Sequence, residues 1–349
     1  MRDLRHSSDE EPGYTRVRRG RGWSYHDEKG DKLDDGDVIE RLNALAVPPA
    51  YKQVWFCKDA GGHIQATGID ERGRKQYRYH DDYRDLAEIA KFDSIVAFAQ
   101  SLPKIRKQVE RHLRRRKLQR EPVLAAIVRL LDTAHLRIGN AAYAKSNKSF
   151  GATTLQHRHV KKLKTRIKLN FRAKHGVQRD VTVTDAALNR VVRECHDLPG
   201  QALFQYVDDR GNTRAVSSSD VNAYLREISG TEFTAKHFRT WGASRLAFEE
   251  VEQQMKAGDK ITLKSVVDPV AKALGNTPAV CRSSYIHPAI IDAVKDKPLD
   301  PLAGTKLPTR GRKRLQRSEA RLIAFLEPGA LKPTKRARIA RFLKGRAPA

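Results

Sequence analysis

The stretch TRIKLNFRAKHGVQRDVTV (Thr165–Val183) decides the fold class of this chain. Thr165–Phe171 is typical of a strand, Arg172–Gly176 of a turn, and Val177–Val183 of the returning strand. The segments on both sides of this hairpin have the apolar spacing of helices. The pattern therefore predicts a mainly helical domain that carries one β-hairpin, with Lys174 at its tip.

Helices are predicted before and after the hairpin. Pro122 suits the first turn of a helix, and its apolar stripe is Val123, Ile127, Leu130 and Leu131. After the hairpin, helices are predicted over Thr184–Cys195, Ser218–Ser229, Thr234–Met255 and Leu263–Leu274. Together these segments make residues 92–300 one mostly helical domain.

The residues before this domain follow a strand pattern. Short alternating segments fill residues 16–80, and the glycine-containing stretches at 59–63 (DAGGH) and 71–74 (ERGR) indicate hairpin turns. A short helix is expected over Asp37–Leu45. We predict a small β-rich domain over residues 16–91 and a disordered N-terminus over residues 1–15. The fold class is therefore α+β.

The end of the chain differs in composition. Past Lys297 it is rich in proline, glycine and basic residues, as in GRKRLQR (311–317) and KRARIARFLKGR (335–346). We expect residues 301–349 to be a disordered basic tail that binds DNA nonspecifically. The alternative is an accessory segment that raises affinity or processivity.

The charge balance indicates a polyanionic partner. The chain has 68 Lys and Arg against 41 Asp and Glu, a net charge of +27, and such a surface attracts nucleic acid. The longest apolar runs are too short to span a membrane, and the polar N-terminus favours a cytoplasmic, nucleoid-associated location. Cys57, Cys195 and Cys281 are expected to be ordinary thiols.

Several chemistries lack their sequence signal. Neither GxxxxGK[ST] nor GxGxxG occurs, and neither HExxH nor a carboxylate cluster with metal-site spacing stands out. We therefore expect no nucleotide, metal or other cofactor. A reaction on a phosphodiester would then need a side-chain nucleophile, with arginine and lysine to neutralise the phosphate.

Four basic or nucleophilic contexts fit that requirement. Arg137 lies in HLRIGN (135–140), Lys174 at the hairpin tip, and Lys236 and Arg239 three residues apart at the start of a helix. Tyr285 lies in LGNTPAVCRSSYIHP (274–288), where a new helix is predicted to begin at Thr277. Taken singly, each has an ordinary alternative: a surface arginine, a solvated turn lysine, or a tyrosine in the core. We expect the helix that carries Lys236 and Arg239 to be partly buried, because Trp241 and Ala243 follow closely.

Their order along the chain resembles that of the type IB DNA topoisomerases, most closely the small poxvirus-like and bacterial branch. Five motifs carry this resemblance: QATGIDERGRKQYRYH (65–80), SFGATTL (149–155), NFRAKHGV (170–177), KHFRTWGAS (236–244) and LGNTPAVCRSSY (274–285). The resemblance implies that this chain relaxes supercoiled DNA by transient single-strand cleavage, strand rotation and religation, without ATP or metal.

The resemblance also implies roles for individual residues. Tyr285 would attack a backbone phosphate and form a 3′-phosphotyrosyl link. Arg137 and Arg239 would donate to its non-bridging oxygens, and Lys174 would protonate the leaving 5′-oxygen. Asn276 stands where the family usually has histidine; an amide can donate a hydrogen bond but cannot carry charge, so we expect it to orient and stabilise.

Further residues match family positions that contact double-stranded DNA: Tyr77, Tyr79 and Gln76 in the β domain, and Tyr143 and Lys236 in the helical domain. The resemblance implies a monomer. A tyrosine site-specific recombinase is the alternative enzyme, although recombinases usually have H-x-x-R where this chain has Lys236–Arg239. A non-enzymatic architectural DNA-binding protein is the other alternative.

Overall fold

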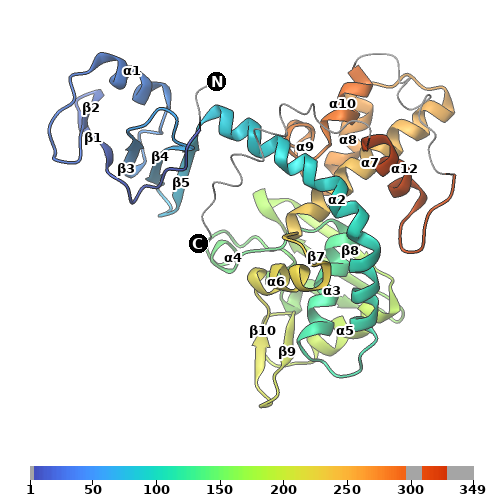
Figure 1. Ribbon diagram of the computed structural model, residues 1–349. Helices are drawn as coiled ribbons and strands as arrows, with labels where there is room; N and C mark the ends of the chain where they lie inside the picture. The colour runs from blue at the N-terminus through green and yellow to red at the C-terminus, as the bar shows by residue number, and fades with distance from the viewer. Residues whose placement is uncertain (1–3, 296–308, 328–349) are drawn as a thin grey trace. The chain divides into compact units, whose positions relative to one another are not determined.

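The structure, a computed structural model, describes residues 4–295 and 309–327 (Figure 1). The chain divides into two compact units between Asp93 and Ser94. Helix α2 (Asp81–Leu113) crosses this division. Within the described ranges, none of the helices combines the length and the apolar character needed to cross a membrane.

The first unit contains a five-stranded antiparallel sheet in the order β2-β1-β3-β4-β5 (Figure 1). Its strands are β1 (Gly13–Arg19), β2 (Gly22–His26), β3 (Lys52–Cys57), β4 (Ile64–Ile69) and β5 (Lys75–Tyr79). The two hairpin turns predicted from glycines are confirmed, because they join β3 to β4 and β4 to β5. The short predicted helix is also confirmed as α1 (Gly36–Ala44). The carboxylate of Asp35 caps its N-terminus by accepting hydrogen bonds from its first backbone amides.

The N-terminal segment is tied to this sheet. The Arg5 amide donates to the Gly61 carbonyl over 2.9 Å, and the buried Ser7 hydroxyl donates to the Ile64 carbonyl over 3.0 Å. The expectation of disorder over residues 1–15 is therefore wrong for residues 4–15, because backbone pairing with the β3–β4 turn fixes them. Residues 1–3 lie outside the described part.

The second unit is mostly helical. Its helices are α3 (Arg120–Ala134), α4 (Ala141–Asn147), α5 (Ala186–His196), α6 (Ser218–Ser229), α7 (Ala235–Ala257), α8 (Leu263–Leu274), α9 (Pro278–Ser284), α10 (Pro288–Lys295) and α12 (Arg317–Leu326). Its strands are β6 (Val160–Lys162), β7 (Ile167–Arg172), β8 (Gln178–Val183), β9 (Gln205–Val207) and β10 (Thr213–Ala215). The α+β class predicted from the sequence is confirmed.

The hairpin that suggested this class is β7–β8, with β6 as a third strand beside β7. Ile167, Leu169 and Phe171 face the core on alternate positions of β7. Helix α3 is the centre of that core. The predicted stripe of α3 is buried, but so are the other residues from Pro122 to Val128, because neighbouring elements cover α3 on all sides.

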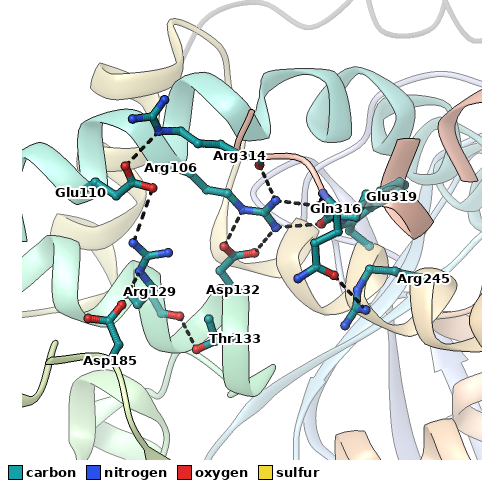
Figure 2. Close-up of polar contacts among 11 residues, drawn as sticks. Arg106, Glu110, Arg129, Asp132, Thr133, Asp185, Arg245, Arg314, Gln316 and Glu319 are labelled. Atoms are coloured by element: carbon teal, nitrogen blue, oxygen red, sulfur yellow. Dashed lines mark hydrogen bonds and ion pairs between the residues drawn. The ribbon is translucent and has the colours of Figure 1, made fainter. Parts of the chain in front are cut away.

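The C-terminal part of the chain corrects the expected tail. Helix α12 packs on α7, and its apolar residues belong to the main core. Glu319 of α12 accepts two hydrogen bonds from Arg106 of α2, each 2.7 Å long, and Arg106 also pairs with Asp132 of α3 (Figure 2). The expectation of a disordered tail is therefore wrong for residues 309–327. The tail residues 301–308 and 328–349 lie outside the described part.

Candidate active site

Two helix ends form the base of the site. Helix α3 ends at Ala134, and His135 follows in the left-handed conformation with φ of 52°. Helix α8 ends at Leu274, and Gly275 follows with φ of 63°, a conformation that glycine adopts without strain. Arg137 lies two residues after His135, and Asn276 directly follows Gly275. The side chains of Arg137 and Asn276 contact one another.

Arg239 joins these two ends. It lies on α7 and is only 5% exposed. Its guanidinium donates to the carbonyl of His135 and, over 3.1 Å, to the carbonyl of Leu274. Since the last carbonyls of a helix lack partners within the helix, this buried cation satisfies both ends and is held rigidly between them.

The side chains of Arg137 and Asn276 contact one another through a hydrogen bond. The Arg137 guanidinium donates to Oδ1 of Asn276. The backbone of Arg137 is fixed in turn, because its carbonyl accepts the Ala152 amide over 2.8 Å. Gly151 permits this packing: a Cβ there would lie 2.5 Å from the Gly139 nitrogen. The glycine of SFGATTL thus lets two loops approach closely enough to place Arg137.

Tyr285 lies beside the same cluster. The Arg239 guanidinium carbon is 5.2 Å from the centre of its ring, and the ring packs against the main core. The residue caps the C-terminus of α9 rather than lying within it. The helix predicted to begin at Thr277 is therefore confirmed, but the tyrosine is presented by the turn after the helix.

Two buried donors in the cluster have no partner among the described residues: Nε of Arg239 and Nδ2 of Asn276. Burial, and then the charge of Arg137, lower the pKa of Arg239, while the Tyr285 hydroxyl opposes this. An arginine remains protonated in a protein, so the cluster concentrates positive charge next to a phenol. Unsatisfied buried donors together with two cations form a site for an anion.

The remaining predicted residues of this unit are Lys174, Lys236 and Tyr143. Lys174 is exposed in the turn between β7 and β8 and makes no hydrogen bond or ion pair with a described residue. Lys236 is exposed, whereas Arg239 is buried, so the expected partial burial of their helix is confirmed. Tyr143 of α4 is half-buried.

The predicted DNA-contact residues of the first unit lie on the edge strand β5. Tyr77 and Tyr79 are 44% and 40% exposed, and their rings stack with centres 5.9 Å apart. Gln76 alternates to the other face, where its amide donates to Asp70 over 3.0 Å. The structure thus brings the two tyrosines together and places the glutamine away from them.

Sequence reasoning missed two residues that support the site. Ser244 of α7 is fully buried; its hydroxyl lies 3.3 Å from the carbonyl of Tyr285 and accepts the amide of His287 over 3.0 Å. Arg179 of β8 contacts the two helix ends. A polar residue in the apolar face of a predicted helix was the available signal for Ser244; no local signal marked Arg179.

Two family descriptions match parts of this chain. Residues 80–300, more than half of the chain, match the family described as the eukaryotic DNA topoisomerase I catalytic core. Residues 22–70 match the N-terminal domain of bacterial DNA topoisomerase IB. The match over residues 22–70 lies in the first unit, and the match over residues 80–300 begins near the end of the first unit and extends through most of the second.

Individual relatives have the same description. DNA topoisomerase 1B of Acanthamoeba polyphaga mimivirus is 32% identical over 295 residues, which span 78% of this chain and 88% of the relative. The vaccinia virus (strain Copenhagen) DNA topoisomerase 1B is 22% identical over 76% of this chain and 84% of its own length. A solved XerH site-specific recombinase bound to its difH substrate has a TM-score of 0.30 and 14% identity, over 61% of this chain and 55% of its own, which is too distant to support an argument. This chain belongs to the type IB DNA topoisomerases.

Proposed function

We propose that this protein relaxes supercoiled double-stranded DNA through a covalent bond between Tyr285 and a 3′-phosphate. The observation that supports it is the position of Tyr285 beside the Arg239 guanidinium, next to two buried donors that lack partners. One phosphate would satisfy both donors. The arrangement matches the charge that develops on a phosphate under attack.

The reaction exchanges one phosphoester bond for another. The Tyr285 oxygen attacks phosphorus, the bond to the 5′-oxygen breaks, and the tyrosine proton passes to solvent. Lys174 gives a proton to the leaving 5′-oxygen. Arg137, Arg239 and Asn276 Nδ2 donate to the non-bridging oxygens. The strand then rotates, and the 5′-hydroxyl attacks the phosphotyrosine to restore both the DNA and the tyrosine.

Because the phosphotyrosyl ester conserves the bond energy, the proposed cycle consumes no nucleotide. We further propose that the protein acts as a monomer in the cytoplasm, where it associates with the nucleoid. Tyr77, Tyr79, Gln76, Tyr143 and Lys236 are proposed to contact the duplex. A monomer that relaxes plasmid DNA in EDTA and without ATP would support these statements, and relaxation that depends on ATP or on a divalent metal would contradict them.

The decisive experiment traps the intermediate. Supercoiled plasmid is mixed with the parent protein and stopped with denaturant, and protein-linked DNA is measured. Tyr285→Phe should abolish the adduct and the relaxation while DNA binding persists. An adduct that survives in Tyr285→Phe would reject the nucleophile. Recombinant products that require two DNA sites would instead indicate the recombinase alternative.

A further inference from the structure

Arg179 connects the β7–β8 hairpin to the base of the candidate active site. It lies on β8, and its Nη1 donates to the carbonyl of Ala273 over 2.7 Å. Its Nη2 donates to the carbonyl of Ala134 over 3.3 Å. These carbonyls belong to the last turns of α8 and α3, where a cation is favoured by the helix dipoles. One side chain of the hairpin therefore contacts two helix ends at once.

These are the ends that Arg239 joins. Arg239 donates to His135 and Leu274, and Arg179 donates to the residue directly before each of them, Ala134 and Ala273. The two arginines thus bridge the same pair of helix ends side by side, one from α7 and one from β8. The helix ends lead directly into Arg137 and Asn276, so Arg179 contacts the segments that place both.

The hairpin is stiff between Arg179 and its tip. Arg179 pairs in register with the buried Phe171 of β7, and the Ala173 amide donates to the Val177 carbonyl over 2.8 Å to close the turn. Lys174 lies inside this closed turn, five positions from Arg179. A displacement of Arg179 therefore moves the tip as a body rather than being absorbed within the strand.

Close packing shows that the hairpin rests on the α8 end. A Cβ added at Gly275 would lie 3.3 Å from Nη1 of Arg179 and 3.4 Å from a methyl group of Val177. Burial, and then the nearby Arg137 charge, lower the pKa of Arg179. A second guanidinium is thus held near Arg137 despite their mutual repulsion, and its two hydrogen bonds to carbonyls offset that repulsion.

We propose that Arg179 is a positioning residue that holds the Lys174 hairpin against the C-terminal ends of α3 and α8. It thereby fixes the position of Lys174, the proton donor, relative to the bound phosphate. This inference rests on the proposed function, in which Lys174 protonates the leaving oxygen. Arg179 itself acts through Lys174 and transfers no proton. Loss of Arg179 should therefore impair the step that needs a proton donor and spare the step that does not.

A change of leaving group separates these steps. A cleavage site is first mapped with the trapped adduct on plasmid DNA. Two duplexes of that sequence are then made, one with the ordinary 5′-oxygen and one with sulfur in its place. A thiolate leaves without protonation, so cleavage of the sulfur duplex needs no general acid. Single-turnover cleavage rates are measured for both duplexes with each variant.

Arg179→Gln should slow cleavage of the oxygen duplex by about 10- to 100-fold, the usual cost of misplacing a reacting group by an ångström. On the sulfur duplex it should regain the parent rate to within about threefold, because that reaction bypasses the acid. Lys174→Ala should behave in the same way, whereas Arg137→Ala should stay slow on both duplexes. Lys168→Gln removes one positive charge from an exposed position of β7 and should leave both rates unchanged.

Each outcome decides the matter. Equal losses on the two duplexes for Arg179→Gln would show that Arg179 stabilises the phosphate itself, and an unchanged oxygen rate would show that it has no role; either result overturns the inference. If Lys174→Ala is not restored by sulfur, the proposed acid fails and the inference fails with it. Thermal unfolding of Arg179→Gln verifies its fold, and Arg179→Lys takes its place if that variant is unfolded.

Discussion

Arg137 donates a hydrogen bond to Oδ1 of Asn276, a residue 139 positions later in the chain. Because Arg137 occupies the amide oxygen, Nδ2 is the group that remains, and it is buried without a partner among the described residues. The amide thus presents a donor next to the Tyr285 cluster. This geometry suits a residue that stabilises a phosphate oxygen and does not move a proton.

Replacement of Asn276 tests that role. Asn276→Ala should lower the cleavage rate by roughly 1–3 kcal/mol in transition-state stabilisation, the range for one lost donor of this kind. Asn276→His should keep or raise the rate, since a neutral imidazole can accept from Arg137 and still donate. The measurement is single-turnover adduct formation at saturating protein.

Asn276→Asp is the matched control. It keeps the size of the side chain and the acceptor for Arg137, but it replaces the donor with a negative charge that faces the phosphate. It should therefore cleave more slowly than Asn276→Ala. Parent-like cleavage by the alanine variant would reject the donor role.

The stacked tyrosines of β5 give a prediction about DNA binding. Tyr77→Phe and Tyr79→Phe keep the stacked rings and remove exposed hydroxyls, so each should weaken duplex binding by roughly tenfold if the hydroxyl contacts a phosphate. Fluorescence anisotropy with a labelled duplex measures the Kd. Gln76 is also proposed to contact the duplex, but Gln76→Ala should weaken binding less than either tyrosine variant, because its amide already donates to Asp70. A larger loss for Gln76→Ala than for either tyrosine would contradict this arrangement.

The pairing of Glu319 with Arg106 predicts a large effect on stability. Glu319 is 1% exposed and also accepts the Trp241 indole N–H over 3.1 Å. Glu319→Gln leaves the buried Arg106 short of one charge partner, which should lower the free energy of unfolding by about 3–5 kcal/mol. Urea denaturation measures this change. Glu232→Gln removes an exposed partner of Arg226, 3.8 Å away, and should change stability by less than about 1 kcal/mol.

Buried histidines predict a loss of stability at acidic pH. Burial lowers the pKa of His135 to about 4 from an ordinary value of 6.5, and burial lowers the pKa of His287 to about 4 as well. Between pH 6.5 and 4, these histidines bind a proton in the unfolded chain but not in the folded chain. The free energy of unfolding is therefore highest above pH 6.5 and decreases as the pH falls toward 4. For His135 the loss is on the order of 3 kcal/mol.

His135→Asn isolates this contribution, because asparagine tolerates the left-handed backbone at that position. Its unfolding free energy, measured in urea at several pH values, should fall less steeply between pH 6.5 and 4 than that of the parent. An unchanged slope would show that His135 is protonated as readily in the folded protein as in the unfolded one.

Local signals explain which parts of the fold could be predicted from the sequence. The bounds of α6 and α8 match the prediction to the residue, because Ser217 and Thr262 cap their starts and Gly230 and Gly275 end them. Strands β6, β9 and β10 have three residues each, which is too few for alternation to be recognised. Helix α12 was hidden by its basic surroundings, although its apolar face is core.

The candidate active site was likewise predictable only in part from the sequence. The side chains with distinctive chemistry could be named from their motifs, and the structure brings Arg137, Arg239, Asn276 and Tyr285 together. What the sequence could not supply is the set of contacts that hold them. Arg179 reads as one basic residue among 68, and its importance depends on two carbonyls that lie 45 and 94 positions away.

The Arg106–Glu319 pair also sets an order of assembly. Arg106 lies in α2 and Glu319 in α12, the last helix of the described residues, 213 positions later. A chain emerging from the ribosome therefore possesses its tyrosine before it possesses the helix that completes the core around Trp241. The core around Trp241 can therefore be completed only after that helix has been made. Tyr285 is thus synthesised before the α12 residues that complete the core against which it packs.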